Sequence, residues 1–336
     1  MAENSGIEWT DHTFNPWRGC QKVSPACKNC YAETRGNRFG ENFSSQRIVL
    51  SEAGWKNPVK WNKQAEINGV RPRVFCASLA DVFEDWDGPM ISGGQSPVYI
   101  GKDYRASHGG NPRLTMEDVR RRLFALIDAT PNLDWLLLTK RPENIRGMWP
   151  FTPGISGNHP ASSFEEAESV PYRHNVWLGT TVENQEQADK RIPELLKCRC
   201  LSPCLFLSCE PLLGPVDLDK SWRIHRPDGY RLNSNQYHAK CPTKGIDWLI
   251  SGGESGPNAR PSHPDWFRSL RDQCRAACVP FHFKQWGKWS PEQGLVSKSP
   301  AHFDGIGDMY PVGKKKAGRL LDGTEHNEFP VNNREG

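Results

Sequence analysis

Three cysteines near the N-terminus have a spacing that can bind a metal centre. Cys20, Cys27 and Cys30 lie in the glycine- and proline-containing loop RGCQKVSPACKNCYAE, with the pattern C-x6-C-x2-C. Two thiolates separated by two residues can bind one metal ion or cluster, and the longer loop lets the third thiolate reach the same centre. No second CxxC pair lies near enough to complete a four-cysteine zinc site. The spacing therefore predicts a centre with three thiolate ligands.

A three-thiolate centre favours an iron-sulfur cluster with a catalytic role. Three thiolates on a 4Fe-4S cluster leave one iron without a protein ligand, and that open position can bind a chelating cofactor. Electron-transfer clusters normally have four cysteine ligands. One alternative is a structural zinc ion with His12 as its fourth ligand, and another is a set of ordinary buried cysteines.

The other eight of the eleven cysteines have a different context. Most lie in expected strands or helices, where cysteine often acts as a small apolar residue. Cys198, Cys200 and Cys204 form a second group, which we interpret as core, with an auxiliary metal site as the less favoured alternative.

Composition describes a globular chain without a targeting segment. The 336 residues are 36% hydrophobic and 24% charged, which argues against a disordered or fibrous protein. The N-terminus MAENSGIEWTDH lacks a signal-peptide pattern, and no apolar run is long enough for a membrane helix. An odd number of cysteines then predicts a cytoplasmic metalloprotein without a membrane partner. The net charge of +4 neither requires nor excludes nucleic acid.

Short apolar runs alternate with helical patterns along the chain. Such alternation predicts parallel strands with helical crossovers, as in a doubly wound sheet or a full or partial (β/α) barrel. The expected helices are Thr115 to Ala129, Glu183 to Lys197 and His263 to Cys278. The expected strands are Arg73 to Leu79, Asp134 to Lys140, Val176 to Val182, Cys204 to Glu210, Asp247 to Gly253 and Pro280 to Lys284.

Polar residues follow nearly every expected strand, and this favours the barrel. In (β/α) barrels the carboxyl ends of the strands meet at one mouth and carry the chemistry. Asp85 to Asn111 and Met148 to His174 are expected to be loops over this mouth, and Lys220 to Lys244 a solvated basic loop. We expect residues 1–290 to form the barrel and residues 291–336 an irregular extension packed on it.

Several motifs resemble, in order, those of a phage-associated family of radical S-adenosylmethionine proteins of unassigned function. The motifs are IEWTDHTFNPWRGC, FCASLADVFED, LLLTKRPENI, VWLGTTVENQ, LSCEPLLGP, WLISGGESG, ARP, VPFHFKQWG and the closing GRLLDG. They span about residues 5 to 290 and the closing segment. The cysteine spacing departs from C-x3-C-x2-C, which is usual in radical S-adenosylmethionine enzymes.

The resemblance implies two cofactors, a 4Fe-4S cluster on Cys20, Cys27 and Cys30, and S-adenosylmethionine. Reductive cleavage of S-adenosylmethionine would give a 5′-deoxyadenosyl radical that abstracts hydrogen from a substrate, while the protein supplies position and excludes water. An external electron donor is implied, and the family is associated with a three-cysteine-motif partner protein.

Most of the other candidate residues lie at or just after the carboxyl ends of the expected strands. The alternative for each carboxylate is that it caps a helix or pairs with a nearby arginine. We predict cofactor-binding roles for Tyr31, Ser78, Asp81, Lys140, Thr180, Thr181, Glu183, Gly252 and Gly253, with Arg141 also able to bind the methionine carboxylate. Glu210 and Glu254 are the candidate catalytic or substrate-binding carboxylates.

Tryptophans beside cations favour a nucleic acid substrate. Indole rings can stack on bases while nearby cations bind phosphate. We therefore assign substrate binding to Trp17, Arg141, Lys284 and Trp286, and expect DNA repair or base modification; packing under long loops is the alternative for the tryptophans. The alternative functions are a zinc-stabilised nucleic-acid-binding protein and a metal-dependent barrel hydrolase using Asp81, Glu210 and Glu254.

Overall fold

The six expected strands are all present in the computed structural model of the chain. It describes residues 2–92, 113–150, 172–218, 245–291, 300–303 and 307–330. The strands are β1 (Ala2–Glu3), β2 (His12–Phe14), β3 (Trp17–Arg18), β4 (Arg47–Val49), β5 (Arg73–Cys76), β6 (Met90–Ile91), β7 (Asp134–Thr139), β8 (Val176–Thr181), β9 (Cys204–Cys209), β10 (Trp248–Gly252), β11 (Phe281–Gln285), β12 (Ala301–Phe303) and β13 (Gly307–Met309).

The strand order of the main sheet identifies the fold class. The order is β1-β2-β5-β7-β8-β9-β10-β11, with β1 antiparallel to β2 and seven parallel strands from β2 onward. From β2 to β11 each strand lies beside the one that precedes it in this sheet, so the order never reverses as it does in a doubly wound sheet. The chain therefore has an α/β fold with the strand order of a partial β/α barrel.

The three expected helices are also present. Thr115 caps α5 (Met116–Asp128), because its Oγ accepts from the Asp118 N–H and the Asp118 carboxylate accepts from the Thr115 N–H. The helices are α1 (Tyr31–Arg38), α2 (Glu52–Trp55), α3 (Asn57–Asn68), α5 (Met116–Asp128), α6 (Ile145–Met148), α7 (Gln185–Leu196), α9 (Pro264–Ala277) and α10 (Lys314–Ala317), with 3₁₀ turns at Pro25–Cys27, Pro142–Asn144 and Arg199–Leu201. None of the helices that the structure describes is long and apolar enough to cross a membrane.

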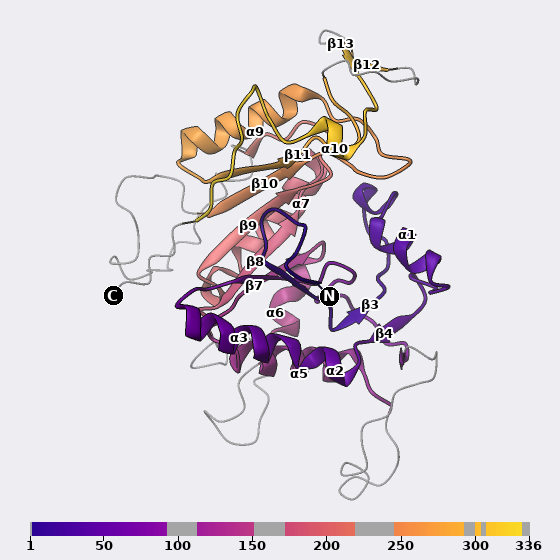
Figure 1. Cartoon of the computed structure of the whole chain (residues 1–336), viewed down its shortest axis with the longest axis vertical. Coiled ribbons are helices and arrows are strands. Elements are labelled where there is room, and N and C mark those ends of the chain that lie inside the picture. The colour runs from indigo at the N-terminus through magenta and orange to yellow at the C-terminus, as the bar shows by residue number, and fades with distance from the viewer. Residues whose placement is uncertain are drawn as a thin grey trace, which may run out of the picture. The chain divides into compact units, whose positions relative to one another are not determined.

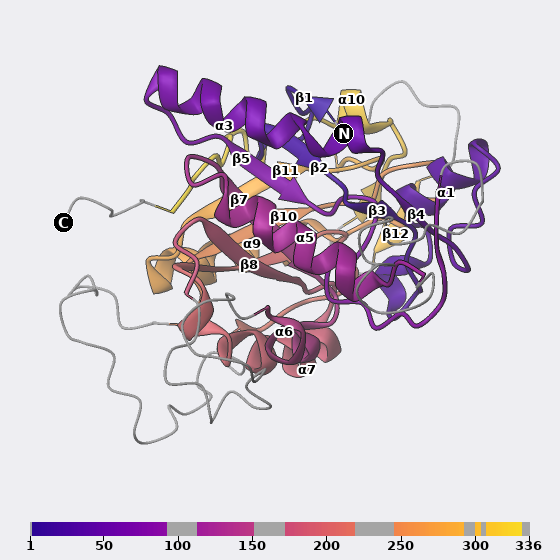
Figure 2. The ribbon, with the colours of Figure 1, turned by 90° about the horizontal axis from the view of Figure 1, so that it is seen from below.

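The chain divides into two compact units with separate cores. Unit 1 comprises Met1–Leu178 with Cys200–Pro203, and unit 2 comprises Gly179–Arg199 with Cys204–Gly336. In unit 1, the Phe14 ring lies edge-on against Trp55 and Trp135, with centroids 5.4 and 5.5 Å away. Figures 1 and 2 show α1 of this unit beside β3 and β4.

In unit 2, α9 packs on β10 and β11, as Figure 1 shows. The Phe267 ring of α9 lies edge-on against Phe283 and Trp286, at 5.1 and 5.2 Å between centroids. Three aromatic rings thus fill the space between this helix and the edge of the sheet.

The segment after α10 is an integral part of unit 2. The Trp286 indole donates to the Leu320 carbonyl at 2.7 Å, and the Trp248 indole donates to the Glu328 carbonyl at 2.9 Å. The Phe283 N–H donates to the His326 carbonyl, so this segment also satisfies part of the free edge of β11. Leu321, in the motif GRLLDG, is fully buried.

Much of the expected loop structure lies outside the described residues. This applies to residues 93–112 and 151–171 of the expected lids, and to residues 219–244, which include the basic loop. The roles predicted for these segments remain predictions.

Leu320 and Leu321 are adjacent in the segment after α10, called the closing segment below. They allow a matched test of how much this segment contributes to the stability of the protein. Leu321→Ala removes a buried side chain and should lower the free energy of unfolding by about 2–5 kcal/mol. Leu320→Ala, at a side chain that is 52% exposed, should change it by less than about 0.5 kcal/mol. Urea unfolding followed by circular dichroism measures both values. Equal values for the two variants would contradict the assignment of this segment to the core of unit 2.

Candidate metal centre

The cysteine loop begins where the chain leaves β3 and ends where α1 starts. Gly19 precedes the first cysteine with φ of +110°, and a Cβ added there would lie 2.0 Å from the Gln46 carbonyl oxygen. Only glycine suits this position, because both the backbone conformation and the close approach exclude a side chain. The Gly19 N–H donates to the Leu79 carbonyl and the Cys20 N–H donates to the Phe43 carbonyl, each at 3.1 Å. The backbone therefore fixes the position of Cys20.

The structure brings two of the three thiols to one small apolar cluster. Cys20 and Cys30 both pack against the cluster formed by Ala32, Phe43 and Leu79. Cys27 ends the short turn at Pro25–Cys27, and its Sγ lies 4.0 Å from the Ser24 hydroxyl. All three cysteines are half-buried.

Asp81 and Glu84 anchor the cysteine loop through one guanidinium group. Arg141 Nη1 donates to the Asp81 carboxylate at 2.9 Å and to Cys20 Sγ at 3.6 Å. Its Nη2 donates to Glu84 at 3.2 Å and to the Gln21 carbonyl at 3.0 Å. Arg141 follows β7 and Asp81 follows β5, so the carboxyl ends of two neighbouring strands meet the cysteine loop here, as expected for the mouth of a barrel.

A second buried arginine completes this network. Arg47 Nε and Nη2 donate to the two Glu84 oxygens at 2.6 and 2.8 Å, and neither side chain is more than 1% exposed. The Gln21 N–H donates to Glu84 Oε1 at 2.7 Å. Sequence reasoning missed Glu84 and Arg47; the i, i+3 spacing of Asp81 and Glu84 after an expected strand was the available signal for the carboxylate.

The network has a direct effect on Cys20. Burial, followed by the negative charges of Asp81 and Glu84, raises the pKa of the Cys20 thiol to about 12, and Arg141 opposes that rise. An isolated thiolate is therefore unfavourable at Cys20, and a bound cationic centre would offset this cost.

The other residues assigned to cofactor binding in unit 1 have specific partners. Asp81 also accepts from the Thr139 hydroxyl at 2.7 Å and from the Lys140 N–H at 3.0 Å, so its carboxylate is fully occupied. The Ser78 hydroxyl lies 3.0 Å from Asn15 Nδ2, and the Tyr31 hydroxyl donates to the Ser78 carbonyl. Within the described part of the chain, the half-buried Lys140 ammonium has no hydrogen-bond or ion-pair partner, which leaves it free for an anionic group. These placements favour Lys140 over Arg141 as the group that binds a carboxylate.

In unit 2, Glu210 and Lys284 form the pair that faces solvent at the strand ends. The Lys284 ammonium lies 2.8 and 2.9 Å from the two Glu210 oxygens, and the side chains are 12% and 19% exposed. Gln285 Nε2 donates to Glu210 at 3.3 Å and to Ser255 at 3.1 Å, while its Oε1 is buried and has no partner among the described residues. Gly252 lies beside the Glu210 carboxylate, where an added Cβ would contact it at 3.5 Å. These residues form the polar end of β9, β10 and β11.

The remaining carboxylates of unit 2 are held by arginines. Glu254 accepts three hydrogen bonds from Arg260, at 2.6 to 2.9 Å. Glu183 is fully buried and accepts from Arg191 at 2.8 Å, and Thr180 and Thr181 are buried with it. The alternative of arginine pairing thus describes Glu183 and Glu254, and these placements do not support roles in ribose binding or acid-base chemistry.

Three further predicted site residues are built into the interior. Trp17 is fully buried, and Trp286 is 5% exposed with its indole N–H bound to the Leu320 carbonyl. The packing alternative fits both rings, and their burial does not support substrate stacking. Gly253 approaches the Trp286 carbonyl so closely that an added Cβ would lie 2.0 Å from it, so this glycine serves backbone packing.

The structure also bears on the alternative centres. His12 lies in β2 and stacks on Trp61 with ring centroids 4.3 Å apart. Over the residues that the structure describes, no three His, Cys, Asp or Glu side chains are grouped to hold a metal ion. Cys198 and Cys204 are buried and Cys200 is half-buried, and Cys209 and Cys274 are buried as expected. The core interpretation is wrong for Cys278, which is exposed because it lies just after the end of α9.

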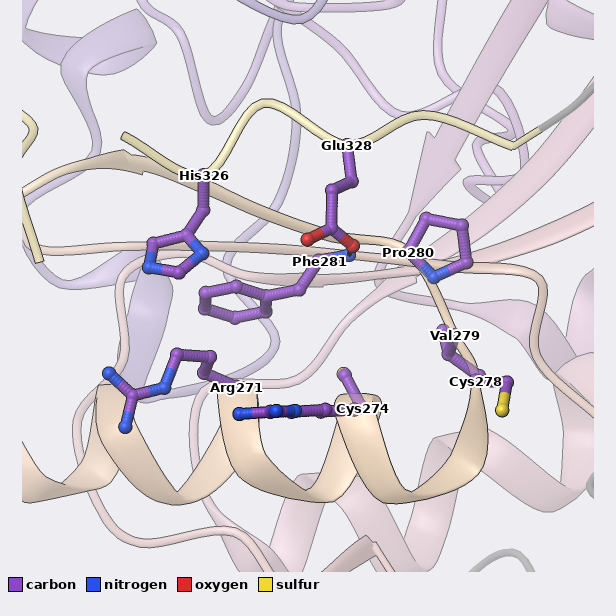
Figure 3. A pocket seen from close by; sticks show the side chains of 9 residues that line it. Arg271, Cys274, Cys278, Val279, Pro280, Phe281, His326 and Glu328 are labelled. Atoms are coloured by element: carbon purple, nitrogen blue, oxygen red, sulfur yellow. Dashed lines mark hydrogen bonds between the residues drawn. The ribbon is translucent and has the colours of Figure 1, made fainter. Parts of the chain in front are cut away.

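One pocket lies at the opposite end of β11 from Lys284. It has a volume of about 500 Å³ and lies between α9 and the closing segment, with Phe281 between Arg271 and His326 (Figure 3). The Arg271 guanidinium is bound to Asp322 and Asp272. In β/α barrels this amino-terminal end of the strands contributes to stability, and we assign it no role in catalysis.

The fold and the loop together define an α/β protein with a cysteine loop at the carboxyl ends of its first parallel strands. The chain matches the model of the family described as protein of unknown function DUF5131 over residues 4–87 and 113–330, and it belongs to that family. No curated protein and no solved structure matches the chain. The family match includes the closing segment of unit 2 as well as the cysteine loop.

Glu84 allows a test of the buried network. Glu84→Gln leaves the Arg47 and Arg141 charges poorly compensated in the interior and should lower the free energy of unfolding by about 3–5 kcal/mol. Glu117→Gln breaks an exposed pair with Arg121 and should cost less than about 1 kcal/mol. Both values follow from urea unfolding at pH 7. A loss for Glu84→Gln no larger than that for Glu117→Gln would show that the network does not stabilise the loop.

Proposed function

We propose that the chain is a radical S-adenosylmethionine enzyme that acts on a nucleic acid or nucleoside. The observation that supports this most strongly is the attachment of the three-cysteine loop to the ends of β5 and β7 through Arg141. Cys20, Cys27 and Cys30 would hold a 4Fe-4S cluster, which when bound would supply the electron for reductive cleavage of S-adenosylmethionine. The proposal extends to an external electron donor and to a three-cysteine-motif partner protein, both of which come from the sequence resemblance.

The donor set fits a cluster better than a single zinc ion. A zinc ion brings four ligands to within roughly 2.3 Å of one atom, whereas a 4Fe-4S cluster binds each thiolate at a different iron. Cysteines arranged around a cluster therefore need not be grouped as ligands of one ion.

The residues around the loop would position the cofactor and tune the sulfur. Arg141 donates to Cys20 Sγ, and a hydrogen bond to a ligand sulfur raises the reduction potential of a cluster. The Lys140 ammonium is available for the methionine carboxylate. Tyr31, at the start of α1, links this helix to the segment after β5 through the hydrogen bond from its hydroxyl to the Ser78 carbonyl.

The hydrolase alternative has less support. Each of the three carboxylates proposed for a divalent metal is already neutralised: Asp81 by Arg141, Glu254 by Arg260 and Glu210 by Lys284. Displacing all three cations would be costly, because two of these carboxylates are buried.

Metal analysis after anaerobic purification tests the proposed centre. We expect a brown protein that absorbs at about 400 nm and contains about four irons per chain. A colourless chain that binds one zinc ion under the same conditions would exclude the proposed cluster.

Two cysteine variants distinguish a proposed cluster ligand in the loop from a buried cysteine in the core. Cys27→Ala should lose iron and reduce the formation of 5′-deoxyadenosine from S-adenosylmethionine and dithionite to background, because a ligand is missing. Cys274→Ala, at a buried position on α9, should retain both iron and activity. Iron content and product are measured on the same anaerobic samples. Equal activity in the two variants would remove the role assigned to the loop.

A further inference from the structure

Helix α1 exposes aromatic and cationic side chains directly after the third cysteine. Ala32 and Gly36 are buried, while Tyr31, Arg35 and Phe39 recur every four residues and are exposed along the adjacent stripe. Phe39 is 68% exposed and Tyr31 is 58% exposed. Burial of two small residues explains how the helix is held, but it does not explain why large rings face water.

Exposed aromatic residues are rare elsewhere in the described part of the chain. Only one further tyrosine, phenylalanine or tryptophan there, Tyr172, is comparably exposed. Two of the three exposed rings thus lie at the two ends of one helix, Tyr31 as its first residue and Phe39 as its C-cap, beside the proposed cluster ligands.

The same surface is positively charged. Residues 22–39 contain four cations and one carboxylate, leaving three positive charges. The carboxylate, Glu33, is paired with Lys22 at 2.7 Å. Lys28, Arg35 and Arg38 form no ion pair with any residue that the structure describes.

The arrangement of one pair indicates the kind of ligand. The Arg35 guanidinium lies over the Phe39 ring, 5.2 Å from its centroid, so a planar cation and an aromatic ring are stacked at the surface. Unpaired bases stack on such planes whatever their sequence, while neighbouring cations contact the phosphates. Tyrosine, phenylalanine and arginine are also enriched at protein interfaces, so the choice of nucleic acid rests on the unpaired positive charge of this surface and on the stacked Arg35–Phe39 pair.

We propose that the α1 face, formed by Lys28, Tyr31, Arg35, Arg38 and Phe39, binds single-stranded nucleic acid beside the cysteine loop. The inference rests on the proposed function and deepens it, because it places the substrate next to the proposed cluster. It also replaces Trp17 and Trp286, which are buried, with exposed rings as the stacking groups.

Fluorescence anisotropy with labelled 15-nucleotide oligo(dT) and oligo(rU) tests the α1 face on the full chain. Phe39→Ala should weaken binding by about tenfold or more, because a stacking ring is lost. Ile67→Ala is the matched control, since Ile67 on α3 is also 68% exposed and should leave binding unchanged. Circular dichroism and thermal unfolding check that both variants are folded.

The salt dependence of binding tests the charge of the face. Arg35→Gln should reduce the slope of log K against log salt concentration by about 0.7, the value for one phosphate contact with a single strand. Lys63→Gln, at an exposed cation on α3, should leave the slope unchanged.

The outcomes distinguish this inference from the proposed function. Failure of the wild-type chain to bind either oligonucleotide, or equal binding by the Phe39 and Ile67 variants, would overturn the inference. It would also be overturned if Phe39→Ala and Arg35→Gln weakened binding of an acidic flavin-containing electron carrier alone, because the face would then dock a protein. Oligonucleotide binding is measured without S-adenosylmethionine or reductant. Oligonucleotide binding without any 5′-deoxyadenosine formation would therefore reject the proposed chemistry but support the inference that the α1 face binds nucleic acid.

Discussion

The candidate centre depends on the burial of Arg141 between two carboxylates and a thiol. A guanidinium in the interior loses its hydration, and it is stable there only because Asp81 and Glu84 accept its hydrogen bonds. The same group also holds the Gln21 carbonyl and Cys20 Sγ. The electrostatic requirement of one side chain thus joins the ends of β5 and β7 to the cysteine loop, and loss of Asp81 or Glu84 leaves the buried guanidinium less well compensated.

Pairing of carboxylates with cations recurs among the residues at the strand ends and limits which of them can act chemically. Glu183 and Glu254 are buried carboxylates, each paired with an arginine, so their charges stabilise local structure. Glu210 differs because its pair with Lys284 is partly exposed and borders the buried, unpartnered oxygen of Gln285. Among these carboxylates, Glu210 is the most exposed.

Local sequence predicted six strands of the main sheet and three helices, because apolar runs and helical periodicity act over a few positions. It did not predict the short strands β3, β4 and β6 or the helices α2 and α3. It also predicted that Asp81 and Arg141 lie at the same end of the sheet. It did not predict the Glu84 to Arg47 pair, which joins residues 37 positions apart through tertiary packing. Tryptophan beside a cation did not distinguish a stacking ring from a core ring, since Trp17 is fully buried while Phe39 is exposed. Exposure depends on the whole fold, and no short motif encodes it.

The backbone around Cys20 is fixed by the protein itself. Gly19 and Cys20 donate hydrogen bonds to the Leu79 and Phe43 carbonyls, and the φ of +110° at Gly19 permits this path only for glycine. Gly19 is buried, so moving this part of the chain would leave its N–H without a partner. On the other side of Cys20, the Gln21 carbonyl accepts from Arg141 and the Gln21 N–H donates to Glu84. The position of the first proposed ligand therefore depends on the same buried charges that join β5 and β7, and not on a bound group.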